Sequence, residues 1–113
     1  MTRQTTDLLK TLIATPSLSR DEKAAADVVE AFLHDHGVST RRYANNIIAM
    51  PERFAPDLPV LMLNSHIDTV RPAPSYSFDP FVPFEENGRL YGLGSNDAGA
   101  SVVSLIAAFL RLR

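Results

Sequence analysis

The stretch PVLMLNSHIDTV, residues 59–70, joins a short apolar run to a polar end. A continuously apolar run of this length is typical of a strand that is buried on both faces of an α/β sheet. In open α/β sheets, ligand sites form in the crevice outside the carboxyl ends of the strands. The stretch therefore predicts an α/β fold with a buried strand at 59–64, and it places His66 and Asp68 where a site would lie.

Two helices are predicted before this strand. In the first, Leu8, Leu9, Leu12 and Ile13 form one apolar face over residues 6–14. Pro16 then disfavours helical geometry in the residue before it, which ends the helix.

The second helix is predicted from the sequence SRDE onward. Ser19 is expected to be its N-cap, with Glu22 as the third helical residue of a capping box. Gly37 lies where a C-cap glycine belongs.

The rest of the chain alternates extended and turn segments before a last helix. One or two short strands are expected around Asn45-Asn46, loops at 51–59 and 71–83, and a hairpin turn at Asn87-Gly88. The final helix, within 97–113, is apolar on nearly every side and must be covered on more than one side. Because the sequence stops within this helical pattern, we expect a truncated α/β domain.

The composition fits one small domain over residues 1–113. The chain has 11 Lys and Arg, scattered, against 13 Asp and Glu, with a net charge of −2. A nucleic-acid partner usually requires a basic stripe, so none is expected. No segment reads as a signal peptide or as a membrane span, and we expect a cytoplasmic protein. Cysteine is absent, which excludes thiolate metal ligands.

His66 and Asp68 are candidates for a metal site. A neutral imidazole binds a metal through one nitrogen, and a nearby carboxylate can accept the other N–H and fix the ring orientation. The alternative is that both side chains only hydrogen-bond the backbone at a strand end.

Asp97 is the second candidate, in the sequence GLGSNDAGAS at the start of the last helix. A carboxylate can bridge two divalent cations, which a single imidazole cannot do. The alternative is that Asp97 or Asn96 simply caps the helix.

Other polar pairs are read as structural. His34 and His36 are two residues apart on a helix and do not share a face. Glu85 and Glu86 lie beside the predicted hairpin turn, and we expect them to be a solvated hairpin end that lacks the desolvated setting of a catalytic carboxyl group.

Taken together, the motifs PSLSRDE, NSHIDTV, DPF and ENGRLYGLGSNDAGAS resemble, in this order, the N-terminal part of the M20 family of metallopeptidases and deacylases. SNDAGAS looks nearest to the acetylornithine deacetylase-like members, which act in arginine biosynthesis. The resemblance implies part of a three-layer α/β/α zinc-peptidase catalytic domain, without the lid domain through which the parent forms a homodimer.

The resemblance also implies the site roles. His66 would be a terminal metal ligand, Asp68 the catalytic carboxylate that orients it, and Asp97 the ligand that bridges two zinc or cobalt ions. A cis peptide would follow at Asp97–Ala98. The sequence departs from the commoner D-M-K-G pattern at this point but keeps the bridging carboxylate.

The implied activity is hydrolysis of an N-acyl amino acid. The general-base glutamate pair and the remaining metal ligands would lie beyond this chain, in the missing C-terminal part. The 113 residues alone are therefore expected to bind metal weakly and to be inactive. Two alternatives stay open, a fragment of an M20 peptidase or dipeptidase and a non-catalytic, stand-alone binding module.

Overall fold

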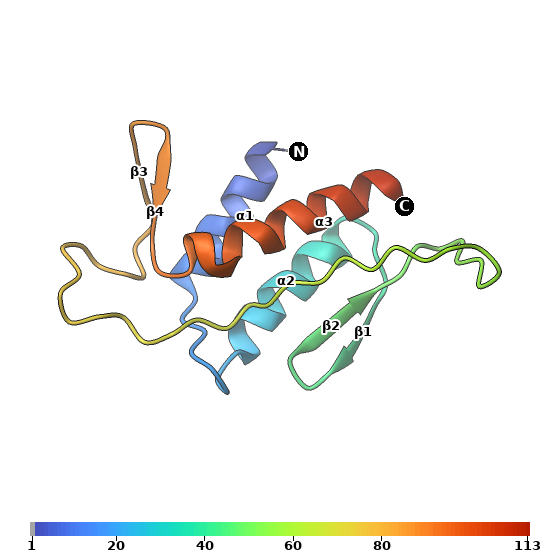
Figure 1. Ribbon diagram of the computed structural model, residues 1–113, viewed down its shortest axis with the longest axis horizontal. Coiled ribbons are helices and arrows are strands. Elements are labelled where there is room, and N and C mark those ends of the chain that lie inside the picture. The colour runs from blue at the N-terminus through green and yellow to red at the C-terminus, as the bar shows by residue number, and fades with distance from the viewer. Residues whose placement is uncertain (1) are drawn as a thin grey trace.

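The computed structural model describes residues 2–113 and is a mixed arrangement of helices and short hairpins (Figure 1). An irregular turn, η1, directly precedes the last helix. In chain order the elements are α1 (Thr2–Ala14), α2 (Lys23–Asp35), β1 (Thr40–Tyr43), β2 (Asn46–Ala49), β3 (Phe84–Glu86), β4 (Arg89–Tyr91), η1 (Ser95–Gly99) and α3 (Ala100–Leu112).

Both predicted N-terminal helices form, and each packs against α3. The apolar face of α1 contributes Leu8, Leu9 and Ile13 to a buried cluster with Val103 of α3. A second buried cluster joins α2 to α3 and is made of Val29, Leu33, Val38 and Val102. The core therefore lies around α3, as the apolar character of this helix requires.

The predicted capping box at the start of α2 is wrong. The helix begins at Lys23, four residues after Ser19, and its first turn has no side-chain cap. A turn comes first, closed by a 2.8 Å hydrogen bond from the Asp21 N–H to the Leu18 carbonyl. The Ser19 hydroxyl instead donates to a carboxylate far along the chain, so it is not free to cap the helix.

The predicted glycine end of α2 is confirmed. Gly37 has a φ of +75°, a conformation that costs glycine little. The Gly37 N–H donates to the His34 carbonyl and the Val38 N–H to the Leu33 carbonyl, both at 2.9 Å. This is the Schellman pattern, and Val38 and Leu33 lie in the same apolar cluster, the contact that usually accompanies it.

The predicted hairpin at Asn87-Gly88 forms, and the one or two strands expected around Asn45-Asn46 form a second, separate two-stranded antiparallel unit. β1 pairs with β2 and β3 pairs with β4. Asn87 and Gly88 have φ values of +52° and +74°, which is the conformation of a type I′ hairpin turn.

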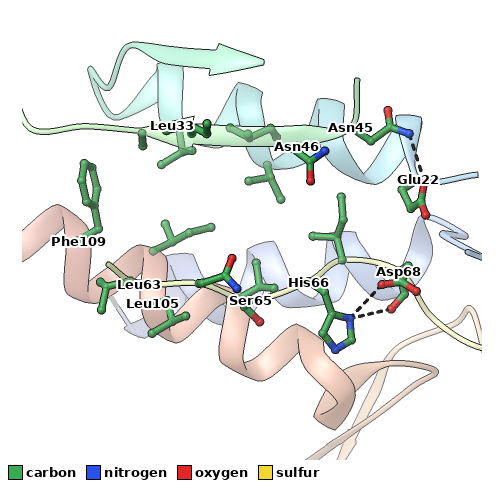
Figure 2. A pocket seen from close by; sticks show the side chains of 18 of the residues that line it. Glu22, Leu33, Asn45, Asn46, Leu63, Ser65, His66, Asp68, Leu105 and Phe109 are labelled. Atoms are coloured by element: carbon green, nitrogen blue, oxygen red, sulfur yellow. Dashed lines mark hydrogen bonds and ion pairs between the residues drawn. The ribbon is translucent and has the colours of Figure 1, made fainter. Parts of the chain in front are cut away.

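The predicted buried strand at 59–64 is not present. Residues 59–68 run extended but pair with no strand, and Val60, Leu61 and Met62 are 65%, 74% and 82% exposed. A strand needs a neighbour that satisfies its backbone, and β2, the nearest candidate, pairs only with β1. Between β2 and residues 62–68 lies a groove of about 740 Å³, with α2 and α3 as its apolar floor (Figure 2).

The architecture is consistent with a portion of an α/β catalytic domain. Helices α1 and α2 cover part of α3, but Leu112 remains 72% exposed and Leu105 to Leu110 are only half-buried. Within residues 2–113, no helix has the length and apolar character that crossing a membrane requires.

A charged network ties α2 to β1. Arg42 forms ion pairs with Asp27 and Glu30 at 2.5 and 3.4 Å, and Thr40 donates to Glu30 at 2.8 Å. Hydrogen bonds from Lys23 and then Arg42 lower the pKa of Asp27 from its ordinary 3.8. The hydrogen bond from Thr40, followed by that from Arg42, lowers the pKa of Glu30 from its ordinary 4.5.

This network predicts a loss of stability in acid. Because the pKa values of Asp27 and Glu30 are lower in the folded state, their contribution is complete above the ordinary values and is lost as pH falls through the folded ones. Urea unfolding between about pH 6 and about pH 3 should therefore give a falling free energy of unfolding. Arg42→Met should flatten this dependence, and an unchanged slope in that variant would show that the network does not act through Arg42.

Candidate metal centre

His66 and Asp97 come from different segments and face each other. His66 lies in the extended segment after residue 64, and Asp97 lies in η1, ahead of α3. The Nε2 atom of His66 is 3.1 Å from Oδ1 of Asp97, and the two side chains are 52% and 86% exposed. The structure thus brings together the two residues predicted to bind metal, at a position open to solvent.

Asp68 lies on the other side of the imidazole ring. Its Oδ1 is 3.1 Å from Nδ1 of His66, and its backbone carbonyl oxygen is 3.2 Å from the same nitrogen (Figure 2). Both interpretations of the H-x-D pattern are therefore represented, since carboxylate and backbone are each within reach of Nδ1. A proton on Nδ1 would leave the lone pair of Nε2 directed at Asp97.

The second carboxylate oxygen of Asp68 accepts a hydrogen bond from Ser19. The distance from Ser19 Oγ to Asp68 Oδ2 is 2.6 Å, across 49 residues of sequence. This hydrogen bond is the largest of the causes that hold the pKa of Asp68 below its ordinary 3.8. Sequence reasoning missed this role of Ser19 because a serine three residues before a glutamate reads as a helix cap.

Backbone contacts hold the loop between α1 and α2 against the end of the extended segment. The Thr69 N–H donates to the Ser17 carbonyl at 2.7 Å, and Leu18 and Thr69 form an isolated parallel bridge. The loop between α1 and α2 is thereby fixed against the end of the extended segment, which places Ser19 beside Asp68.

The turn η1 presents Asp97 without using it as a cap. The start of α3 has no side-chain cap, so neither Asp97 nor Asn96 fills the capping role considered as an alternative. Gly94 has a φ of +74°, and its carbonyl accepts a 2.8 Å hydrogen bond from the Gly99 N–H, which closes the turn. The Asp97–Ala98 peptide bond is cis, as predicted.

The other two histidines and Glu85 each have a separate contact. His34 Nε2 is 2.8 Å from Thr40 Oγ1, and His36 Nδ1 is 2.8 Å from the Phe32 carbonyl oxygen. Glu85 forms an ion pair with Lys10 at 3.3 Å. These contacts agree with the structural interpretation of His34, His36 and Glu85.

The donor atoms at this position suit a divalent cation. Imidazole nitrogen and carboxylate oxygen are ligand atoms that zinc accepts, and His66 and Asp97 offer one of each face to face. Among residues 2–113, no group of three or more His, Cys, Asp or Glu side chains could hold a metal ion. The pair is therefore short of the three protein ligands typical of a catalytic zinc.

Comparisons with known proteins indicate the family that the chain resembles. Residues 62–113 match the model of Peptidase family M20/M25/M40. The chain is 36% identical over 108 residues to a succinyl-diaminopimelate desuccinylase of Xylella fastidiosa, covering 90% of this chain and 28% of that protein. The desuccinylase of Bordetella avium is 30% identical over 105 residues, with the same shares covered.

A third relative carries a different name. A protein named "probable carboxypeptidase" from Emericella nidulans is 34% identical over 113 residues, covering 91% of this chain and 26% of that protein. The chain thus spans between 26% and 28% of the length of these curated relatives. The similarities support the M20 family, but they do not single out the acetylornithine deacetylases or confirm the predicted link to arginine biosynthesis.

Gly94 gives a test of how η1 is built. An alanine there would keep an unfavourable positive φ, which costs about 1–2 kcal/mol, and its Cβ would lie 2.5 Å from Cγ2 of Thr69. Gly37 is a matched control, because its φ is +75° and a Cβ there meets nothing within 4 Å. We expect Gly94→Ala to lower the free energy of unfolding in urea more than Gly37→Ala does. Equal losses would mean that the contact with Thr69 does not constrain the turn.

Proposed function

We propose that this chain is part of a metal-dependent amidohydrolase of the M20 type, which removes the acyl group from an N-acyl amino acid. One observation carries the proposal, the 3.1 Å approach of His66 Nε2 to Asp97 Oδ1 with Asp68 behind the imidazole. The imidazole of His66 thus lies between two carboxylates, with Asp97 from a separate segment at Nε2 and Asp68 at Nδ1. The family similarity adds a chemical context in which divalent metal ions are general.

His66 and Asp97 are the residues that would hold metal. A divalent ion bound by them would lower the pKa of a bound water and polarise the amide carbonyl of the substrate. The carboxylate of Asp68 would accept a hydrogen bond from Nδ1–H of His66 and so fix the ring with Nε2 directed at Asp97. Asp97 is the most exposed of the three side chains, which leaves its second carboxylate oxygen accessible to a second cation.

The activity would be that of the complete protein. Two facing ligands are too few for a tightly bound catalytic ion, and the hydrolysis also needs a general base for the water. Glu85 and Glu86 lie on an exposed hairpin and not beside His66, so we assign them no such role. The 113 residues by themselves are proposed to bind metal weakly and not to turn over substrate.

The sequence motifs and the relatives differ in the acyl group that they indicate. The sequence motifs favour an acetyl group, as in N-acetylornithine, whereas two of the relatives are named for removing succinyl from diaminopimelate. The relative named as a carboxypeptidase leaves peptide cleavage as the second candidate. All three reactions hydrolyse an amide bond, so the chemistry of His66, Asp68 and Asp97 is common to them.

Variants of a complete M20 polypeptide that contains this chain test the proposal. Zinc-loaded protein would be assayed with N-acetylornithine, N-succinyl-diaminopimelate and a dipeptide. His66→Ala and Asp97→Ala should each lower kcat/KM by more than about a hundredfold, and Asp68→Asn by about 10–100-fold as an orienting residue. His34→Ala is the control and should leave kcat/KM unchanged. Full activity in His66→Ala would contradict the proposal.

A further inference from the structure

The carboxylate of Asp68 is held at both of its oxygens. Oδ1 is 3.1 Å from His66 Nδ1, and Oδ2 is 2.6 Å from the Ser19 hydroxyl. A carboxylate with a single partner can turn about its Cβ–Cγ bond, because this terminal torsion is broad. Two donors on opposite oxygens restrict that rotation and leave one oxygen in line with the imidazole.

We infer that Ser19 is a positioning residue for the metal centre, acting through Asp68 on the orientation of His66. This inference rests on the proposed function, in which His66 binds metal. Outer partners of a metal-ligating histidine fix its tautomer and ring orientation, and their loss typically costs 10–100-fold in metal affinity or activity. Ser19 is one contact further out, so the lower end of this range is expected.

Ser19 is itself held by the backbone around it. It lies in the turn closed by Asp21 N–H and the Leu18 carbonyl, and the next residue, Arg20, has a φ of +74°. Such a value is uncommon for a residue other than glycine and persists only where the surroundings impose it. Here the Arg20 N–H donates to Glu22 Oε1 at 2.6 Å, and the Leu18–Thr69 bridge holds the other side of the turn.

The hydroxyl of Ser19 is not used to start the neighbouring helix. α2 begins at Lys23 after Glu22, with no side-chain cap on its first turn. The Ser19 side chain is exposed, so it fills no space in the apolar core. Its hydrogen bond to Asp68 is therefore the contact through which Ser19 would act on the orientation of His66.

Ser17 is a matched control in the same loop. Its side chain is buried, 4% exposed, and among residues 2–113 its hydroxyl has no hydrogen-bond partner. The backbone carbonyl of Ser17, which accepts from Thr69, is unaffected by a change of side chain. Ser17→Ala thus deletes the same atom two residues away without touching Asp68.

The experiment compares Ser19→Ala, Ser19→Thr and Ser17→Ala in the 113-residue chain. Zn²⁺ is titrated while the ring nitrogen shifts of His66 are followed by NMR, and the urea midpoint of each variant is recorded. We expect Ser19→Ala to weaken His66-dependent zinc binding about tenfold. Ser19→Thr, which keeps the hydroxyl, should restore binding to within about twofold, and Ser17→Ala should not change it.

The outcomes separate the positioning role from a merely structural one. Equal zinc affinity of Ser19→Ala and Ser17→Ala overturns the inference, as does a loss in Ser19→Ala that Ser19→Thr does not restore. A lower urea midpoint with unchanged zinc affinity also overturns it, because Ser19 would then only support the fold.

Failure of the proposed function would be seen separately, as an absence of His66-dependent zinc binding in the wild type. In that case the metal-free spectra decide whether Ser19 positions Asp68. A change in the Asp68 carboxyl carbon and His66 ring shifts on Ser19→Ala, but not on Ser17→Ala, supports the positioning contact. Unchanged shifts in Ser19→Ala overturn it.

Discussion

The backbone contact of Thr69 with Ser17 and Leu18 is the constraint on which the candidate site depends. The 2.7 Å hydrogen bond from the Thr69 N–H to the Ser17 carbonyl fixes the end of the extended segment against the loop that joins α1 to α2. His66 and Asp68 lie directly before Thr69, so this hydrogen bond also restricts the directions in which their side chains point. The other half of the candidate site is Asp97, which lies in η1, directly before α3. Its position is fixed because α3 packs against α1.

The part of the extended segment that precedes His66 has few packing contacts. Residues 60–62 expose large apolar side chains, and the segment forms one rim of a groove whose other rim is β2. Unpaired extended backbone can pair with the edge of another chain, and exposed apolar surface is costly in water. Natural proteins usually cover such edges. The site is thus built at the ordered end of a segment whose apolar part has no strand beside it.

The sequence allowed much of this to be predicted wherever the cause was local. The apolar stripe of α1, the Gly37 end of α2 and the Asn87-Gly88 turn each depend on residues close together in the chain, and all three are confirmed. The predictions of a strand at 59–64 and of a helix cap at Ser19 were wrong because both features depend on partners far away in the sequence. A strand needs a neighbour to pair with. The hydroxyl of Ser19 donates to the carboxylate of Asp68, 49 residues away, instead of capping α2.

We propose that His66 and Asp97 form two halves of one metal position, and crystals soaked in zinc test this proposal most directly. Anomalous diffraction at the zinc edge locates the ion without any assumption about activity. We predict an anomalous peak bonded to Nε2 of His66 and a carboxylate oxygen of Asp97, at about 2.0–2.2 Å from each. Zinc bound at His34 or His36 instead, with none at His66, would contradict it.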